Sequence, residues 1–285
     1  MLETKDLFGC HVSISGGVEK SPERARELTC NVMQIFTANQ RRWQTKPISP
    51  ESAESFKTNL AEYKIQTVMS HDSYLINLCA VKPDIYEKSL SAFVEEINRC
   101  KALGVRLLNF HPGSHGGAGE EAGVKLIAES LKKILPEVKG ADLKLVLENT
   151  AGMGASVGWK FEHLAEIIGL AGSPEDFGVC IDTCHAFAAG YDFRTEAAFD
   201  TVWREFDDII GLKYLSAIHV NDSKGDLGSR LDRHDNLGDG MLGDGAFKLL
   251  VNDNRLKTVP MFLETPGGDE AFKKNLKLMR KWVKN

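Results

Sequence analysis

Eight short apolar runs that alternate with helical stretches are the feature that most constrains the fold of this chain. The runs lack the strict polar alternation of a strand with one face in water, which suits strands that are covered on both faces. We therefore expect strands at 8–12, 32–37, 66–70, 106–111, 143–148, 178–182, 214–219 and 260–264.

The segments between these runs carry helical signals. Apolar residues recur at three- and four-residue steps in 84–103 and in 160–171. Segment 50–64 opens with Ser49 and Pro50, a cap followed by proline at the first helical position. Strands that alternate with helices favour a closed (β/α)8 barrel, the TIM-barrel architecture, and leave an open doubly wound sheet as the alternative.

Composition is that of an ordinary globular enzyme, with 285 residues, 42% of them hydrophobic and 26% charged. No linker divides the chain, so we expect a single domain over 1–285. No apolar run approaches the roughly 20 residues that span a bilayer, and the N-terminus lacks the apolar stretch of a secretion signal. Six scattered cysteines are typical of free thiols. We expect a cytoplasmic monomer without membrane association.

Side chains that bind metals fall at the ends of six consecutive expected strands. In a β/α barrel these carboxyl ends converge on one face, where active sites are built. The six strand-end residues are His71, His111, Glu148, Asp182, His219 and Glu264. Loops add three more, which are His185, Asp232 and His234, the last two within the long irregular stretch 220–242.

Each of these residues taken singly is more often a structural group held by hydrogen bonds. Nine together are different, because four carboxylates buried in one mouth without cations would be prohibitive. Imidazole and carboxylate without thiolate suit Zn²⁺ or a related divalent ion, and nine ligands imply two or three ions. We expect His163 to be structural, whereas the roles of His11 and His115 stay open.

The net charge of −5 limits how this chain could bind nucleic acid. Proteins that coat nucleic acid through their own surface are normally basic. Any affinity for DNA must therefore be local or supplied by metal ions.

Several long motifs, in order along nearly the whole chain, resemble the endonuclease IV family of zinc-dependent apurinic/apyrimidinic endonucleases. They are GCHVSISGG (9–17), NQRRW (39–43), HDSYLINL (71–78), NFHPGSH (109–115), LENTAG (147–152), CIDTCHAFAAGYD (180–192), HVNDSK (219–224), GSRLDRH (228–234) and LET (263–265).

The resemblance implies a site with three Zn²⁺ ions per chain, partly replaceable by Mn²⁺, on the nine residues already found. Glu148 would bridge two of the ions, and Glu148 and Glu264 would be the catalytic carboxylates. The first ion would take His71, His111 and Glu148, the second Glu148, Asp182, His219 and Glu264, and the third His185, Asp232 and His234.

The reaction implied by the resemblance is hydrolysis of the phosphodiester 5′ to an abasic site in double-stranded DNA, leaving a 3′-hydroxyl. Family members also remove blocking groups from 3′ ends. Arg41 matches the residue that the family inserts into the base stack, and Tyr74 and Leu75 match its other wedge residues. Asn39 and Gln40 match positions that contact the DNA backbone. Composition alone would make the Arg41 segment a solvated basic turn.

Two other functions compete with this interpretation. A sugar isomerase or epimerase on a related barrel would use two or fewer ions and would not need the loop that carries Asp232 and His234. A protein that binds damaged DNA without cutting it would not need both Glu148 and Glu264, and both are intact.

Overall fold

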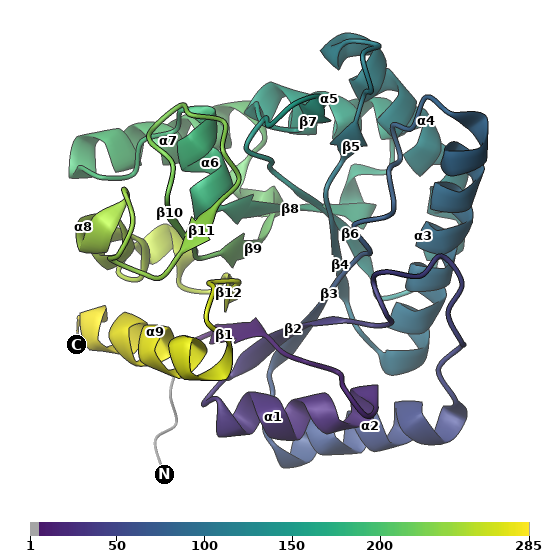
Figure 1. The fold of residues 1–285 in the computed structure, drawn as a ribbon, viewed down its shortest axis with the longest axis horizontal. Helices are drawn as coiled ribbons and strands as arrows, with labels where there is room; N and C mark the ends of the chain where they lie inside the picture. The colour runs from purple at the N-terminus through teal and green to yellow at the C-terminus, as the bar shows by residue number, and fades with distance from the viewer. Residues whose placement is uncertain (1–5, 285) are drawn as a thin grey trace.

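The computed structural model describes residues 6–284 as a closed ring of eight parallel strands surrounded by helices (Figure 1). Residues 1–5 and 285 lie outside the described residues, and with them part of the stretch that argued against a secretion signal. The strands are β1 (Phe8–His11), β2 (Val32–Phe36), β3 (Thr67–His71), β4 (Leu107–Phe110), β6 (Lys144–Glu148), β8 (Phe177–Asp182), β9 (Leu215–His219) and β12 (Met261–Leu263).

The ring closes where the first strand meets the last. Strand β1 pairs in parallel with β12, through Phe8 and Met261, and on its other side with β2, through Gly9 and Val32. Gly9 permits this approach, because a Cβ there would lie 1.8 Å from the Val32 carbonyl oxygen. The expected (β/α)8 barrel is confirmed, and the open doubly wound sheet is wrong.

Helices connect the strands and cover the outside of the barrel (Figure 1). The three expected helices form, and Ser49 caps one of them by accepting a hydrogen bond from the Ser52 amide at 3.2 Å. The covering helices are α1 (Ser21–Glu27), α2 (Pro50–Glu62), α3 (Pro83–Leu103), α4 (Glu120–Val138), α5 (Phe161–Ala171), α7 (Glu196–Ile209), α8 (Gly243–Leu250) and α9 (Gly268–Trp282).

The hydrophobic core has two parts. The larger lies between the strands and the covering helices, and contains buried aromatic side chains such as Phe93, Phe110 and Trp203. The smaller fills the inside of the barrel, and we call it the apolar plug. It consists of Val32, Met69, Val146, Cys180, Ala217 and Phe262.

Smaller elements lie at the carboxyl ends of the strands. They are helix α6 (Thr183–Ala189) and two antiparallel ribbons, β5 (Gly113–Ser114) with β7 (Ser156–Val157) and β10 (Asp222–Ser223) with β11 (His234–Asp235).

The stretch 220–242, expected to be irregular, contains the second of these ribbons. The Asp222 carboxylate accepts hydrogen bonds from the backbone amides of Gly238, Gly240 and Leu242 at 2.9 to 3.1 Å. One buried carboxylate therefore ties both ends of the stretch together.

Candidate metal centre

Each strand of the barrel, or for β12 the residue directly after it, contributes one polar side chain to the interior beside the apolar plug. Side chains two residues apart on a strand point to the same face. Met69 of the plug is followed in this way by His71, and Phe262 by Glu264. The result is a polar layer at the carboxyl ends of the strands, formed by His11, Gln34, His71, Asn109, Glu148, Asp182, His219 and Glu264.

Two groups of candidate ligands lie in and beside the polar layer. Within each group, the ligand atoms lie within 4.8 Å of one another. In the first, His71 Nε2 lies 3.3 Å from Glu148 Oε2, and His111 Nε2 lies 3.4 Å from Glu148 Oε1. Glu148 also belongs to the second group, so its carboxylate lies between the two. The second group consists of Glu148, Asp182, His219 and Glu264.

A third group contains the three candidates that follow the strands. His185 Nε2 lies 3.2 Å from Asp232 Oδ1 and 3.4 Å from His234 Nε2. His185 lies on helix α6 rather than on the expected loop, because the Asp182 side chain caps that helix and accepts a hydrogen bond from the His185 amide at 2.9 Å. Asp232 and His234 reach the site because the long stretch folds back over the barrel mouth.

Three of the five histidines in these groups have one ring nitrogen beside a backbone carbonyl. A metal-binding histidine usually donates its other N–H in this way, which fixes the tautomer and the orientation of the ring. The three contacts are His71 Nδ1 to Asp72 O at 2.9 Å, His185 Nδ1 to Asn149 O at 3.0 Å and His234 Nδ1 to Glu264 O at 3.3 Å.

This arrangement fits a divalent cation. With both Nδ1 atoms donating to carbonyls, the Nε2 atoms of neutral His185 and His234 face each other as lone pairs at 3.4 Å. Two lone pairs at that distance repel each other unless a cation or a proton lies between them. Imidazole with carboxylate is a donor set that zinc accepts. All three groups therefore could hold metal ions.

The electrostatics of the protein alone point the same way. Burial favours the neutral acid of Glu148, but the imidazoles of His219 and His111 outweigh it and hold the pKa of that carboxyl well below its usual range. Burial lowers the pKa of His71, yet the hydrogen bond to Glu148 and the negative charges of Glu148, Glu264 and Asp72 together outweigh it and raise this pKa to about 9. The ionised carboxylates of this site need positive charge beside them. A metal ion can supply that charge in place of the protons on the imidazoles.

Cys184 lies near the third group, because its Sγ is within 4.8 Å of ligand atoms of Asp182 and His234. Burial raises the pKa of the Cys184 thiol to about 12. A protonated thiol is a poor metal ligand, since the thiolate is the binding form. The carboxylates and imidazoles of this group are therefore better candidate metal ligands than the Cys184 thiol.

Three amide side chains that the sequence analysis did not single out hold the carboxylates. Asn109 donates a short hydrogen bond to Glu148 Oε2. Asn221 donates to Asp182 Oδ2 at 2.7 Å, and Gln34 donates to Glu264 Oε1 at 2.6 Å. The signal was a polar residue inside an otherwise apolar run, as in VMQIF and LLNF.

The expected DNA-contact residues lie on the loops after β2 and β3. Asn39 and Arg41 are exposed and Gln40 is half-buried, in a turn where Asn39 Oδ1 accepts from the Arg41 amide at 2.9 Å. Tyr74 is 62% exposed, and Leu75 beside it is half-buried.

The two loops are joined directly. Ser73 Oγ donates to the Gln40 carbonyl at 2.7 Å, and the Leu75 amide donates to Ser73 Oγ at 3.3 Å. The Tyr74 ring packs edge-on against Phe36 with 5.7 Å between ring centroids. These contacts hold all five residues on one side of the mouth.

The remaining histidines separate into two kinds. His11 belongs to the polar layer, where its Nδ1 lies 2.9 Å from Gln34 Nε2. His115 Nδ1 accepts hydrogen bonds from the amides of Gly117 and Gly119, and His163 is packed beside Trp159, as expected for structural groups.

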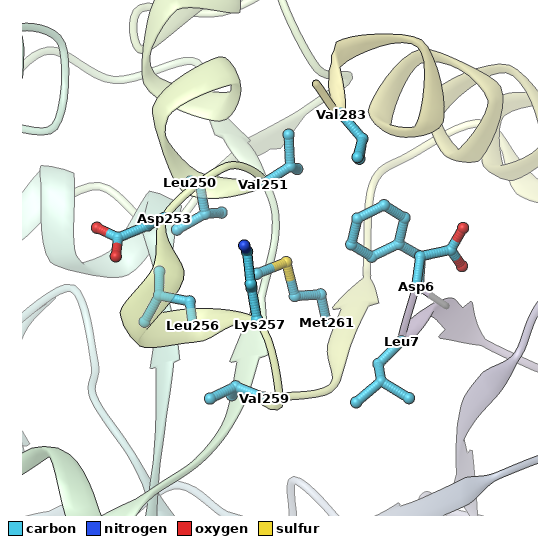
Figure 2. Close-up of a pocket in the computed structure, with 11 residues that line it drawn as sticks. Asp6, Leu7, Leu250, Val251, Asp253, Leu256, Lys257, Val259, Met261 and Val283 are labelled. Carbon is cyan, nitrogen blue, oxygen red and sulfur yellow. The ribbon is translucent and has the colours of Figure 1, made fainter. Parts of the chain in front are cut away.

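A cavity of about 370 Å³ lies at the opposite end of the barrel (Figure 2). It is lined mainly by apolar side chains, including Leu7, Val259 and Met261 at the starts of β1 and β12. Asp6, Asp253 and Lys257 are its charged members, and no histidine lines it. The polar layer, at the other ends of the same strands, is where metal chemistry can occur.

Comparison with known proteins identifies the family. Residues 22–282 match the family model described as xylose isomerase-like TIM barrel. The chain is 48% identical to probable endonuclease 4 of Geotalea daltonii over 98% of its own length and 99% of the relative's. It is 46% identical to probable endonuclease 4 of Chloroflexus aurantiacus over 97% and 98% of the two chains.

The chain belongs to the endonuclease 4 family. The resemblance inferred from the motifs is thereby confirmed. Among solved structures, endonuclease IV from Thermus thermophilus superposes with a TM-score of 0.85 at 35% identity, covering 96% of this chain and 98% of that one.

Sugar-converting enzymes share the barrel with the endonuclease 4 family. A D-tagatose 3-epimerase-like protein superposes with a TM-score of 0.75 at 17% identity, covering 96% of each chain. At that identity the likeness shows the fold alone. None of the helices in residues 6–284 has the length and apolar character to cross a bilayer.

Proposed function

We propose that this nuclease hydrolyses the phosphodiester 5′ to abasic sites in double-stranded DNA, leaves a 3′-hydroxyl, and removes blocking groups from 3′ ends. The observation that carries the proposal is the set of three contiguous ligand groups at the barrel mouth. They lie beside exposed side chains suited to opening a duplex. Membership of the endonuclease 4 family supports a DNA substrate.

Three zinc ions per chain are the cofactor that we propose, with Mn²⁺ as a partial replacement. When bound, zinc supplies Lewis acidity that polarises a phosphoryl oxygen and acidifies water near neutral pH. The ligand sets are those that the resemblance to the family implies. His71, His111 and Glu148 would hold the first ion, Glu148, Asp182, His219 and Glu264 the second, and His185, Asp232 and His234 the third.

The chain's own residues then have three tasks. Glu148 and Glu264 would hold the ions and accept a proton in the mouth of the barrel. Arg41, Tyr74 and Leu75 open the base stack, because chemistry on a stacked nucleotide is sterically blocked. Asn39 and Gln40 contact the DNA backbone.

We further propose that residues 1–285 act as one catalytic domain and as a monomer in the cytoplasm. A sugar isomerase on this fold would leave unexplained the third ligand group and the exposed Arg41 turn.

The proposal is tested by incubating the zinc-loaded protein with a duplex that contains one abasic analogue, with and without a chelator. We expect a single incision 5′ to the lesion, which the chelator stops and added zinc restores. An intact duplex of the same sequence is the control. Absence of incision by a protein that holds three zinc ions would reject the enzymatic proposal.

A further inference from the structure

Gln34 is an amide in the polar layer that contacts three of the other members. Its side chain is fully buried, and it projects inward from β2 two residues after Val32 of the apolar plug. Its amide lies 2.6 Å from Glu264 Oε1, 2.6 Å from His219 Nε2 and 2.9 Å from His11 Nδ1. A buried amide with three such partners has a defined orientation. Which end is the oxygen and which is the NH₂ group follows from whether each partner donates or accepts a hydrogen bond.

The carboxylate determines which end of the amide is which. Ionised Glu264 can only accept hydrogen bonds, so the Gln34 atom beside it is the NH₂ group. The Gln34 oxygen therefore faces His219 Nε2 and can only accept from it. Hence Nε2 of His219 carries a hydrogen.

The other nitrogen of His219 faces the acids. Its Nδ1 lies 3.1 Å from Glu148 Oε1, 3.5 Å from Glu264 Oε2 and 3.8 Å from Asp182 Oδ2. With the ring neutral and its hydrogen on Nε2, Nδ1 presents a lone pair to the middle of the second ligand group. His71, His185 and His234 obtain the same result from backbone carbonyls, whereas His219 obtains it from a side chain.

His11 completes the network without competing for the metal. The NH₂ group of Gln34 has a second hydrogen, which points to His11 Nδ1 at 2.9 Å, closer than the 3.4 Å between His11 Nδ1 and Glu264 Oε1. His11 Nδ1 therefore accepts, and its ring is neutral.

We propose that Gln34 is a positioning residue of the metal centre, whose amide fixes the metal-binding tautomer of His219 and at the same time holds the Glu264 carboxylate. This inference rests on the proposed function for its metal, and it adds a residue that is not itself a ligand. Partners of this kind typically contribute about 10- to 100-fold to metal affinity or activity.

The experiment compares Gln34→Met and Gln34→Glu with the unchanged protein. Methionine fills a similar volume and removes all three hydrogen bonds. Glutamate still accepts from His219 Nε2 but cannot donate to Glu264. Gln66→Met is the matched control, because Gln66 is exposed and precedes β3 at the opposite end of the barrel.

Zinc affinity and stoichiometry are measured first, by competition with a chromogenic chelator, with no DNA present. We expect Gln34→Met to lower the affinity for one of the zinc ions by about 10- to 100-fold. Gln66→Met should leave the affinity for all of the zinc ions unchanged. A downfield proton signal from His219 Nε2–H should appear in the zinc-loaded unchanged protein and in Gln34→Glu, and should be absent in Gln34→Met. For both Gln34 variants, the kcat for cleavage of abasic duplex should fall, whereas KM should change little.

The outcomes separate this inference from the proposed function. Wild-type zinc affinity, ring-proton signal and kcat in a folded Gln34→Met protein would overturn the inference, even if abasic DNA is cut. Lower thermal stability with unchanged zinc affinity would assign Gln34 a merely structural role and would overturn it too.

If Gln34→Met does not fold, unchanged kcat in Gln34→Glu overturns the role toward Glu264, and loss of its ring-proton signal overturns the role toward His219. Weakened zinc binding in Gln34→Met, with no incision even by the unchanged protein, would uphold the inference and reject the proposed function.

Discussion

Glu264 shows how much of the site depends on the surroundings of single residues. Burial favours its neutral acid, but the imidazoles of His219 and His71 hold its pKa well below the usual range. The carboxylate is therefore ionised, and Gln34 holds one of its oxygens by a hydrogen bond. A buried carboxylate held in this way is ready to bind a cation without rearrangement.

Replacing Glu264 with glutamine is expected to abolish incision while duplex binding largely survives. The amide keeps the shape of the side chain but loses the charge that holds metal. We expect kcat to fall by more than about 100-fold, because outer partners of ligands already cost about 10- to 100-fold. Incision and duplex affinity are measured in parallel, with the exposed Glu270→Gln as control. Incision at a near-normal rate would remove Glu264 from the catalytic residues.

Arg41 and Arg42 are adjacent, exposed and equally charged, which makes them a matched pair. A residue that enters the base stack contributes mainly to binding of the lesion, whereas a phosphate contact strengthens binding to any duplex alike. We expect Arg41→Ala to lower affinity for abasic duplex more than for intact duplex, and Arg42→Ala to lower both equally or neither. Equal losses on both duplexes in Arg41→Ala would make Arg41 a phosphate contact.

Residue types at strand ends sufficed to find six of the nine candidate ligands, because parallel strands bring their carboxyl ends together. The other three were found in the segments that follow the strands. The same reasoning could not find Gln34, since an amide is not a typical ligand. Its partners lie 23, 185 and 230 residues away in the sequence. No local pattern contains such contacts, and only the closed barrel brings them within reach.

At the scale of elements, helix α3 supports the loop that carries Arg41. Arg99 on this helix donates to Thr37 Oγ1 at 2.9 Å and to Thr45 Oγ1 at 2.7 Å, near the two ends of the loop. It also pairs with Glu96 at 2.7 Å, and both charged side chains are buried. One ion pair therefore anchors the loop at both sides of its exposed tip.

Removing Arg99 is expected to destabilise the protein and loosen this loop. Arg99→Met leaves the Glu96 charge buried without its partner, which typically costs about 3–5 kcal/mol. The exposed pair Arg106–Asp142 is the control, and Arg106→Met should cost less than about 1 kcal/mol. Urea unfolding measures both, and proteolysis within the loop measures its mobility. If Arg99→Met costs no more than Arg106→Met, the buried pair does not anchor the loop.

The strands were predictable to within about a residue at most ends, because runs covered on both faces are continuously apolar. Helix α6 was missed because its seven residues follow directly on a strand, and nothing in composition separates them from a loop. The ribbon of β10 and β11 was missed for a different reason. Its strands have only two residues each, and the Asp222 carboxylate holds the stretch together through backbone amides 16 to 20 residues away.

At the scale of the whole molecule, charge must be concentrated for a protein of net charge −5 to bind DNA. The three proposed Zn²⁺ ions would add +6 to that value and bring the chain to +1. The added charge would lie in a mouth lined by carboxylates and imidazoles, so attraction for phosphate would centre on the site rather than on the surface. Under this proposal, metal loading would govern both the chemistry and the electrostatics of the protein.

Metal loading should also govern stability, because an ion that binds only the folded state stabilises it by mass action. A free zinc concentration of 1,000 times the dissociation constant adds about 4 kcal/mol per site, which corresponds to a rise in Tm on the order of 10 °C. We expect chelation to lower Tm by at least this much, zinc to restore it, Mn²⁺ to restore part of it, and Mg²⁺ to restore little, because Mg²⁺ prefers oxygen ligands. Differential scanning calorimetry over a series of metal concentrations checks this, and a Tm indifferent to chelation would mean that the three ligand groups do not hold ions.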